Sequence, residues 1–240
     1  MRYTERFYRN VINTDLTCFR LNVEESDLLI LSEKDVSAEA ENELKKQRQI
    51  LKQYIKDFPD FYYSFNPVEC DESAPEIIRI MCGASFLCNV GPMATVAGAI
   101  AEVIGKRLLN ISPQIIIENG GDIFLMTAKE RTISIFAGTS PFSLKTGIKL
   151  KPRDCPFGVA TSSATVGHST SLGNADSVTV VCPSSSLADG LATYFCNLPI
   201  DEEFRNIKEK IVEFPFLEGI VVIKNEQMFS WGDLEIVYLE

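Results

Sequence analysis

The chain has 240 residues, 45% of them hydrophobic, and its 23 basic and 33 acidic side chains give a formal net charge of −10. A chain of this length can bury a sizeable core. The acidic balance excludes sequence-independent binding to nucleic acid or to an anionic membrane surface, and no stretch is apolar enough to cross a bilayer.

The cysteines give no sign of a metal or disulfide framework. There are seven of them, an odd number, and no two form a C-x-x-C pair. The N-terminal residues MRYTERFYRN contain no apolar signal core. We therefore expect a cytoplasmic protein in which most thiols are reduced and buried.

The first half of the chain predicts strands followed by helices. Alternating apolar residues predict two or three strands over 2–12 and 16–32. A helix is expected from Ser37 to Phe58, where Pro59 ends it, and an extended arm over 60–75. Two helices follow at 76–88 and 92–109, and Gly98 inside the second indicates close packing of another backbone.

The second half predicts mostly strands. The sequence QIIIENGGDIFLMT at 114–127 is typical of a hairpin. Further strands are expected at 131–137, 146–151, 157–161 and 176–182, then a helix near 202–213 and a small meander over 219–224, 227–231 and 234–239. Without regular βαβ alternation or a repeat, the pattern predicts an α+β class and one domain over 1–240, with two lobes around a shared cleft as the alternative.

Candidate functional residues concentrate between 158 and 197. His168 is the only histidine and would suit a general base near pH 7, although a lone histidine in a polar loop is commonly just solvated. Three neighbouring hydroxyl residues could donate to a phosphate or a ring carbonyl, or could form a turn: Thr161, Ser162 and Ser163. The nucleophile-elbow spacing G-x-S-x-G is absent.

Two further motifs each allow a structural and a functional interpretation. Ser186 and Asp189 have the spacing of a capping box, whereas Asp189 and Thr193, four residues apart on a helix, could present two oxygen ligands to Mg²⁺. The segment Asn119-Gly120-Gly121-Asp122 suits a hairpin turn, or a place where backbone groups approach a ligand without obstruction by a Cβ atom.

Taken together, these motifs resemble the ApbE-type FAD:protein FMN transferase superfamily over about residues 75 to 200. The similarity lies in the glycine-pair turn, in GVATS at 158–162, and in SVTVV at 177–181 followed by LADGLAT at 187–193. The last segment is similar to the family's S-V-T-V…A-D-A-L-A-T, with Gly190 in place of an alanine. The helix start GPMA at 91–94 agrees with an uncharacterised branch.

The resemblance implies an α+β, ApbE-like fold of mixed strands and helices, with Mg²⁺ and FAD or FMN as ligands. Asp189 and Thr193 would hold the metal, and Asp122 would mark the third position, a backbone carbonyl beside the glycine pair. In the transferases a protein hydroxyl attacks the FAD diphosphate and AMP leaves. His168 lies near the place of their H-x-x-D-P-x-T-G motif, but the text here is HSTSLG at 168–173, which lacks D-P-x-T-G.

Three hypotheses follow from the sequence. The first is a Mg²⁺-dependent enzyme acting on a flavin nucleotide or another diphosphate-linked ligand, with His168 as base. The second is a flavin- or nucleotide-binding module that lacks transfer chemistry. The third is an assembly protein in which the glycine-rich helix over 92–109 joins copies into a homo-oligomer.

Overall fold

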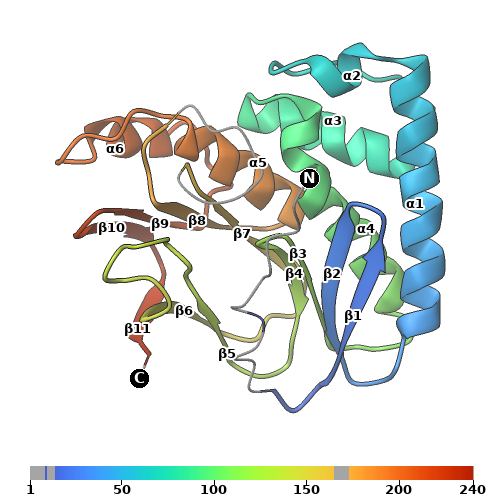
Figure 1. Ribbon diagram of the computed structural model, residues 1–240, viewed down its shortest axis with the longest axis horizontal. Coiled ribbons are helices and arrows are strands. Elements are labelled where there is room, and N and C mark those ends of the chain that lie inside the picture. Colours follow the sequence, from blue (N-terminus) through green and yellow to red (C-terminus); the bar gives the residue numbers. More distant parts are fainter. Residues whose placement is uncertain (1–8, 10–13, 165–172, 240) are drawn as a thin grey trace.

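The computed structural model describes residues 9, 14–164 and 173–239 (Figure 1). Helices cover one side of a large antiparallel sheet, and a small sheet covers part of the other side. The α+β class is confirmed. The predicted strand over 2–12 lies almost wholly outside the described residues, and the prediction of one domain stays a prediction.

The large sheet has eight strands in the order β1-β2-β3-β4-β7-β8-β9-β10, and all neighbours are antiparallel. The expected 16–32 segment forms a hairpin of its first two strands, and the 114–127 segment forms the predicted hairpin of the next two. The strands are β1 (Thr17–Val23), β2 (Ser26–Ser32), β3 (Ile115–Asn119), β4 (Asp122–Met126), β7 (Phe157–Ser162), β8 (Ser177–Cys182), β9 (Gly219–Lys224) and β10 (Gln227–Gly232).

The small sheet corrects the prediction of a C-terminal meander. Its strands are β5 (Arg131–Ser134), β6 (Thr146–Leu150) and β11 (Glu235–Tyr238), in the order β11-β6-β5. After β10 the chain therefore leaves the large sheet, and β11 pairs with β6, some ninety residues earlier in the chain. Gly232 has a φ of 97°, which allows the chain to bend away after β10.

The helices agree with the sequence pattern except at one place. They are α1 (Ser37–Asp57), α2 (Asp60–Tyr63), α3 (Glu76–Cys88), the 3-10 turn η2 (Pro92–Thr95), α4 (Val96–Leu108), α5 (Ser185–Cys196) and α6 (Arg205–Ile211). Within the described ranges no single helix has the length and hydropathy of a membrane span, and α3 with η2–α4 does so only as a pair bent by 102°.

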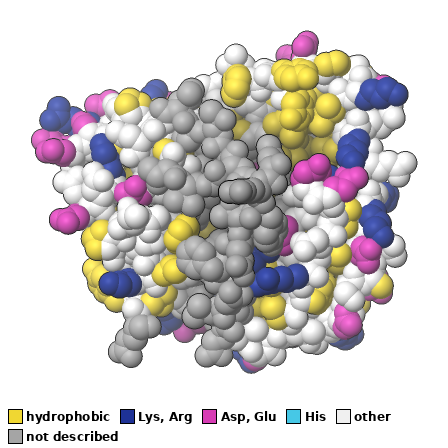
Figure 2. Space-filling view, in the orientation of Figure 1, with side chains coloured by type: hydrophobic (Ala, Val, Ile, Leu, Met, Phe, Trp, Pro, Cys, Tyr) yellow, Lys and Arg dark blue, Asp and Glu magenta, His cyan; other side chains and the backbone are white. Residues whose placement is uncertain are grey.

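The helix α2 replaces part of the extended arm expected over 60–75. Pro59 ends α1, but its backbone is helical, so it also begins the next short helix. Of the aromatic side chains here, Phe61 is buried, whereas Tyr63 and Phe65 are 72% and 84% exposed. Figure 2 shows hydrophobic side chains gathered on the surface over α2 and α3. The aromatic content that suggested a strand therefore lies mostly at the surface.

Three hydrophobic clusters hold the layers together. One lies between α1, α3, α4 and strands β1 to β4, and a second between α5, α6 and strands β7 to β9. The third fills the space between the two sheets. In β4, Phe124 points to the helices, whereas Ile123 and Leu125 point to the small sheet. The central strands are buried on both faces, which explains their nearly continuous apolar sequences.

The cysteines differ in their exposure to solvent. Cys18 and Cys155 are exposed, whereas Cys88 and Cys182 are buried. Burial raises the pKa of the Cys88 thiol to about 12 and that of Cys182 well above its ordinary value. Since the thiolate is the nucleophile, we expect iodoacetamide at pH 8 to label the two exposed cysteines in the native protein and the buried pair only after unfolding. Mass spectrometry of the peptides measures this, and native labelling of Cys88 would contradict it.

Candidate functional site

The candidate site lies where the β3–β4 turn, the first turn of α4 and the first half of α5 meet (Figure 1). The backbone N–H of Gly98 donates to Oδ2 of Asp189 at 2.9 Å. Next to it, Nδ2 of Asn119 donates to the carbonyl of Ala97 at 3.1 Å. Residues separated by up to 91 positions in the sequence are thereby joined at one place.

Two glycines allow α5 to approach this closely. A Cβ atom on Gly98 would lie 2.2 Å from the carbonyl oxygen of Ser185, and one on Gly158 would lie 2.3 Å from the Cα of the same serine. The close backbone packing predicted at Gly98 is therefore confirmed. The backbone it contacts belongs to α5 of the same chain, so the glycine side of α4 is not available to a second copy.

Helices α4 and α5 cap each other. Asp189 of α5 accepts from the third N–H group of α4, which has no capping side chain of its own. In return, Glu102 of α4 accepts from the backbone N–H and the hydroxyl of Ser186, at 3.2 and 2.8 Å. Each carboxylate thus satisfies donors at the positive end of the other helix.

This arrangement corrects the capping-box interpretation of Ser186 and Asp189. The residue that caps α5 locally is Ser184, whose side chain accepts from the N–H of Leu187 at 3.3 Å. Asp189 turns instead toward α4 because Gly98 has no side chain in the way. The aspartate connects two helices rather than starting one.

The Asp189 carboxylate is buried, and no basic side chain among the described residues balances its charge. Burial raises its pKa to about 7, and the backbone N–H groups of Gly98 and Ala97 lower it in part. Among the described residues, no lysine or arginine side chain forms an ion pair with it. A buried carboxylate is costly unless it is paired, hydrogen-bonded or bound to a metal. The hydrogen bonds from α4 meet this requirement, and a carboxylate is also the type of ligand that suits a hard cation.

The other predicted metal ligands lie on neighbouring elements. Thr193 is half-buried one helical turn after Asp189, so the two side chains lie on the same side of α5. Asp122 is buried at the start of β4 and pairs with Ala160 of β7, the strand on which α5 packs. Within the described ranges, no three His, Cys, Asp or Glu side chains are grouped to hold a metal ion. A cation here would depend on one carboxylate with hydroxyl or carbonyl oxygens.

The glycine pair forms the predicted turn with left-handed backbone. Gly120 and Gly121 have φ values of 76° and 109°. The carbonyl of Gly121 accepts from the N–H of Thr161 at 3.1 Å, and its own N–H donates to Oε1 of Glu118 at 2.8 Å. The turn is therefore fixed from β7 and from β3, and Asn119 ties it to α4.

The three hydroxyl residues mark the end of β7 rather than a turn. Thr161 and Ser162 belong to the strand, and Ser163 follows it; all three are half-buried. The hydroxyl of Thr161 shares a hydrogen bond of 3.0 Å with that of Thr179. The predicted base His168 lies outside the described residues.

Several residues at the site were not identified from sequence. Glu102 is 4% exposed although it lies within an apolar helix, and a carboxylate on a buried helix face was the available signal. Cys88 accounts for the glycine at position 190, because a Cβ atom on Gly190 would lie 2.9 Å from the sulfur of Cys88. Glu118 has no sequence signal beyond an acidic residue in an apolar strand.

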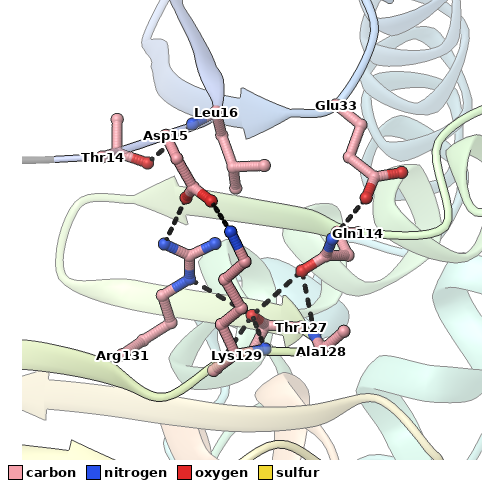
Figure 3. Close-up of polar contacts among 9 residues, drawn as sticks. All are labelled: Thr14, Asp15, Leu16, Glu33, Gln114, Thr127, Ala128, Lys129 and Arg131. Carbon is pink, nitrogen blue, oxygen red and sulfur yellow. Dashed lines mark hydrogen bonds and ion pairs between the residues drawn. The ribbon is translucent and has the colours of Figure 1, made fainter.

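The opposite end of the β3–β4 hairpin carries a separate polar cluster (Figure 3). Asp15 pairs with Arg131 at 2.7 Å and also with Lys129, and Gln114 accepts from the N–H of Ala128 at 2.9 Å. These ion pairs hold the pKa of Asp15 well below its ordinary range. The cluster lies one strand length away from the glycine turn, and its contacts join the segment before β1 to β5 and to the end of the hairpin.

Known structures show the same fold. The chain matches the flavinyl transferase ApbE of Pseudomonas stutzeri with a TM-score of 0.58 and 15% identity, over 92% of this chain and 95% of that one. It matches the flavin transferase ApbE of Vibrio cholerae with a TM-score of 0.54 and 11% identity, over 90% and 96%. The layered sheets and helices are thus those of an ApbE-type protein.

Sequence comparison gives higher identities than these structural matches. The family model described as AbpE bacteria matches residues 9–211, and the chain belongs to that family. A UPF0280 protein of Methanocaldococcus jannaschii is 42% identical over 222 residues, 90% of each chain. A UPF0280 protein of Archaeoglobus fulgidus is 34% identical over 223 residues, 90% of this chain and 92% of that one. These names state no activity, which agrees with an uncharacterised branch.

Proposed function

We propose that this protein binds a flavin nucleotide, FAD or FMN, through its phosphates with the help of Mg²⁺. Asp189 and Thr193 supply the metal ligands, and the backbone beside Asp122 supplies a carbonyl oxygen. The observation that carries the proposal is geometric. Asp189 and Thr193 share one side of α5, close to the start of α4 and to the glycine turn, and the Asp189 carboxylate forms no ion pair among the described residues. A bound Mg²⁺ would neutralise charge on the phosphoryl oxygens.

The chain's own groups suit a phosphate ligand at this place. The glycine turn offers backbone without Cβ atoms, since Gly120 is exposed with φ at 76°. The end of β7 offers the hydroxyl groups of Thr161, Ser162 and Ser163. These groups can bind and orient the nucleotide, whereas the Asp189–Gly98 contact holds the carboxylate in position.

We further propose that the protein transfers FMN from the bound FAD to an acceptor hydroxyl. This proposal rests on the ApbE-type fold and on the LADGLAT segment at 187–193. His168, which precedes that segment, would act as the base that removes a proton from the acceptor hydroxyl. One observation favours a second function, a binding module without transfer: the segment HSTSLG lacks D-P-x-T-G. The two functions differ in whether AMP is released from FAD.

The test is titration of the purified protein with FAD, FMN and ATP, with and without Mg²⁺, measured by calorimetry and by flavin fluorescence. We expect FAD to bind, and to bind about tenfold or more tightly with Mg²⁺, because the metal offsets the repulsion between the diphosphate and Asp189. The proposal would be excluded if neither FAD nor FMN bound, or if their affinity were the same with and without Mg²⁺.

A second measurement separates transfer from binding. The protein is incubated with FAD, Mg²⁺ and candidate acceptor proteins, and AMP is measured by chromatography. AMP release that is lost in His168→Ala supports transfer, whereas tight FAD binding without AMP release supports the binding module.

A further inference from the structure

Arg9 is a buried arginine that contacts the hairpin carrying the glycine turn. Its side chain is only 1% exposed and lies against two carboxylates, Asp27 of β2 and Glu118 of β3. Nη1 donates to Oδ1 of Asp27 at 2.7 Å, Nη2 donates to the carbonyl of the same residue at 2.9 Å, and Nε donates to Oε2 of Glu118. One guanidinium thus contacts two strands.

Glu118 connects Arg9 to the glycine turn. One carboxylate oxygen, Oε2, accepts from Arg9, and the other, Oε1, accepts from the N–H of Gly121 at 2.8 Å. Gly121 in turn accepts from Thr161 of β7. A chain of contacts therefore runs from Arg9 through one side chain to the glycine pair and on to the strand with the hydroxyl residues.

We propose that Arg9 is a positioning residue for the glycine turn, acting through Glu118, and that it thereby sets the affinity for the flavin nucleotide; this rests on the proposed function. The guanidinium fixes the rotamer of Glu118 because it binds that carboxylate in a buried setting, where charge-assisted hydrogen bonds are strong. The N–H of Gly121 is bound by this carboxylate and its carbonyl by the N–H of Thr161, so the place of the turn relative to β7 depends on the position of Glu118.

The test compares Arg9→Gln with Arg131→Gln. The control removes an arginine that pairs with an aspartate, Asp15, at the other end of the same hairpin (Figure 3). We expect both variants to lose thermal stability. Only Arg9→Gln should weaken FAD binding in Mg²⁺, by about tenfold, because a hydrogen bond to a charged group fixes the turn there. Equal FAD affinity in the two variants would overturn the proposal.

A second pair of variants covers the case in which Arg9→Gln does not fold. Glu118→Gln keeps a side-chain oxygen for the N–H of Gly121, whereas Glu118→Ala removes it. We expect both variants to weaken FAD binding, because both lose the charge-assisted contact with Arg9. Glu118→Ala should weaken it more, by about tenfold, because it also loses the acceptor for the N–H of Gly121. Wild-type affinity in both variants would show that Glu118 does not control the site.

A measurement without ligand separates this inference from the proposed function. Hydrogen exchange of the Gly121 amide, followed by NMR, reports directly on the turn. We expect about tenfold faster exchange in Arg9→Gln and Glu118→Ala and no change in Arg131→Gln. If the wild-type protein binds no flavin nucleotide, the proposed function fails, and the exchange rates alone decide whether Arg9 positions the turn.

Discussion

Asp189→Asn is expected to abolish the Mg²⁺-dependent part of FAD binding while leaving the fold intact. The amide oxygen of asparagine can still accept from the N–H of Gly98, so the contact that caps α4 survives. What is lost is the negative charge, which a hard cation needs from its ligand. Calorimetric titration with FAD, at zero and saturating Mg²⁺, should give the same affinity in this variant.

Asp189→Ala provides the control for the structural role of the same residue. It removes the acceptor for the N–H of Gly98 and should lower the free energy of unfolding by about 1–3 kcal/mol. Asp189→Asn should keep a melting temperature close to that of the wild type. If Asp189→Asn retains the full Mg²⁺ effect, this side chain is not a metal ligand.

Gly98→Ala is expected to cause a large loss of stability for a substitution that adds one methyl group. The new Cβ atom would lie 2.2 Å from the carbonyl oxygen of Ser185 and 2.8 Å from the Cβ of Asp189, so α4 and α5 must separate. Overpacking of this kind costs about 3 kcal/mol, of which the better helix propensity of alanine returns about 1. The net loss of about 2 kcal/mol corresponds to about 4–8 °C in melting temperature.

Gly83→Ala is the matched control, because this glycine is also inside a helix, α3, but has no atom within 4 Å of the added methyl group. It should raise the melting temperature by about 2 °C, through helix propensity alone. Calorimetric melting of both variants checks the pair. Equal melting temperatures for Gly98→Ala and Gly83→Ala would mean that α4 and α5 are not in close contact.

The elements that sequence predicted well are those set by local pattern. The helix from Ser37 and the hairpin around Gly120 and Gly121 occur as predicted, and the helix predicted at 92–109 occurs as the 3-10 turn η2 followed by α4. Their signals are periodicity, a proline at the first turn and glycines that accept positive φ. Each depends on neighbours within a few residues, which is why one sequence suffices.

The elements that sequence predicted poorly are those set by distant contacts. No local feature of 234–239 shows that β11 pairs with β6 rather than with β10. Likewise, Ser186 and Asp189 have capping-box spacing, but Asp189 bonds to Gly98, ninety-one residues away. At the site, Asp189 and Thr193 are suggested as metal ligands by their helical spacing and by a family resemblance, whereas Glu102, Glu118 and Arg9 become visible only when tertiary contacts are known.

The mutual capping of α4 and α5 changes how relatives of this protein should be judged. Asp189 would be retained in a relative that binds no metal at all, because losing it leaves the start of α4 uncapped. The side chain of Thr193 caps no helix in the described contacts. Its backbone carbonyl accepts from the N–H of Asn197. Under the proposed function, Thr193 is therefore more informative than Asp189: a relative with the aspartate but without the threonine would be expected to keep the fold and to lose the metal.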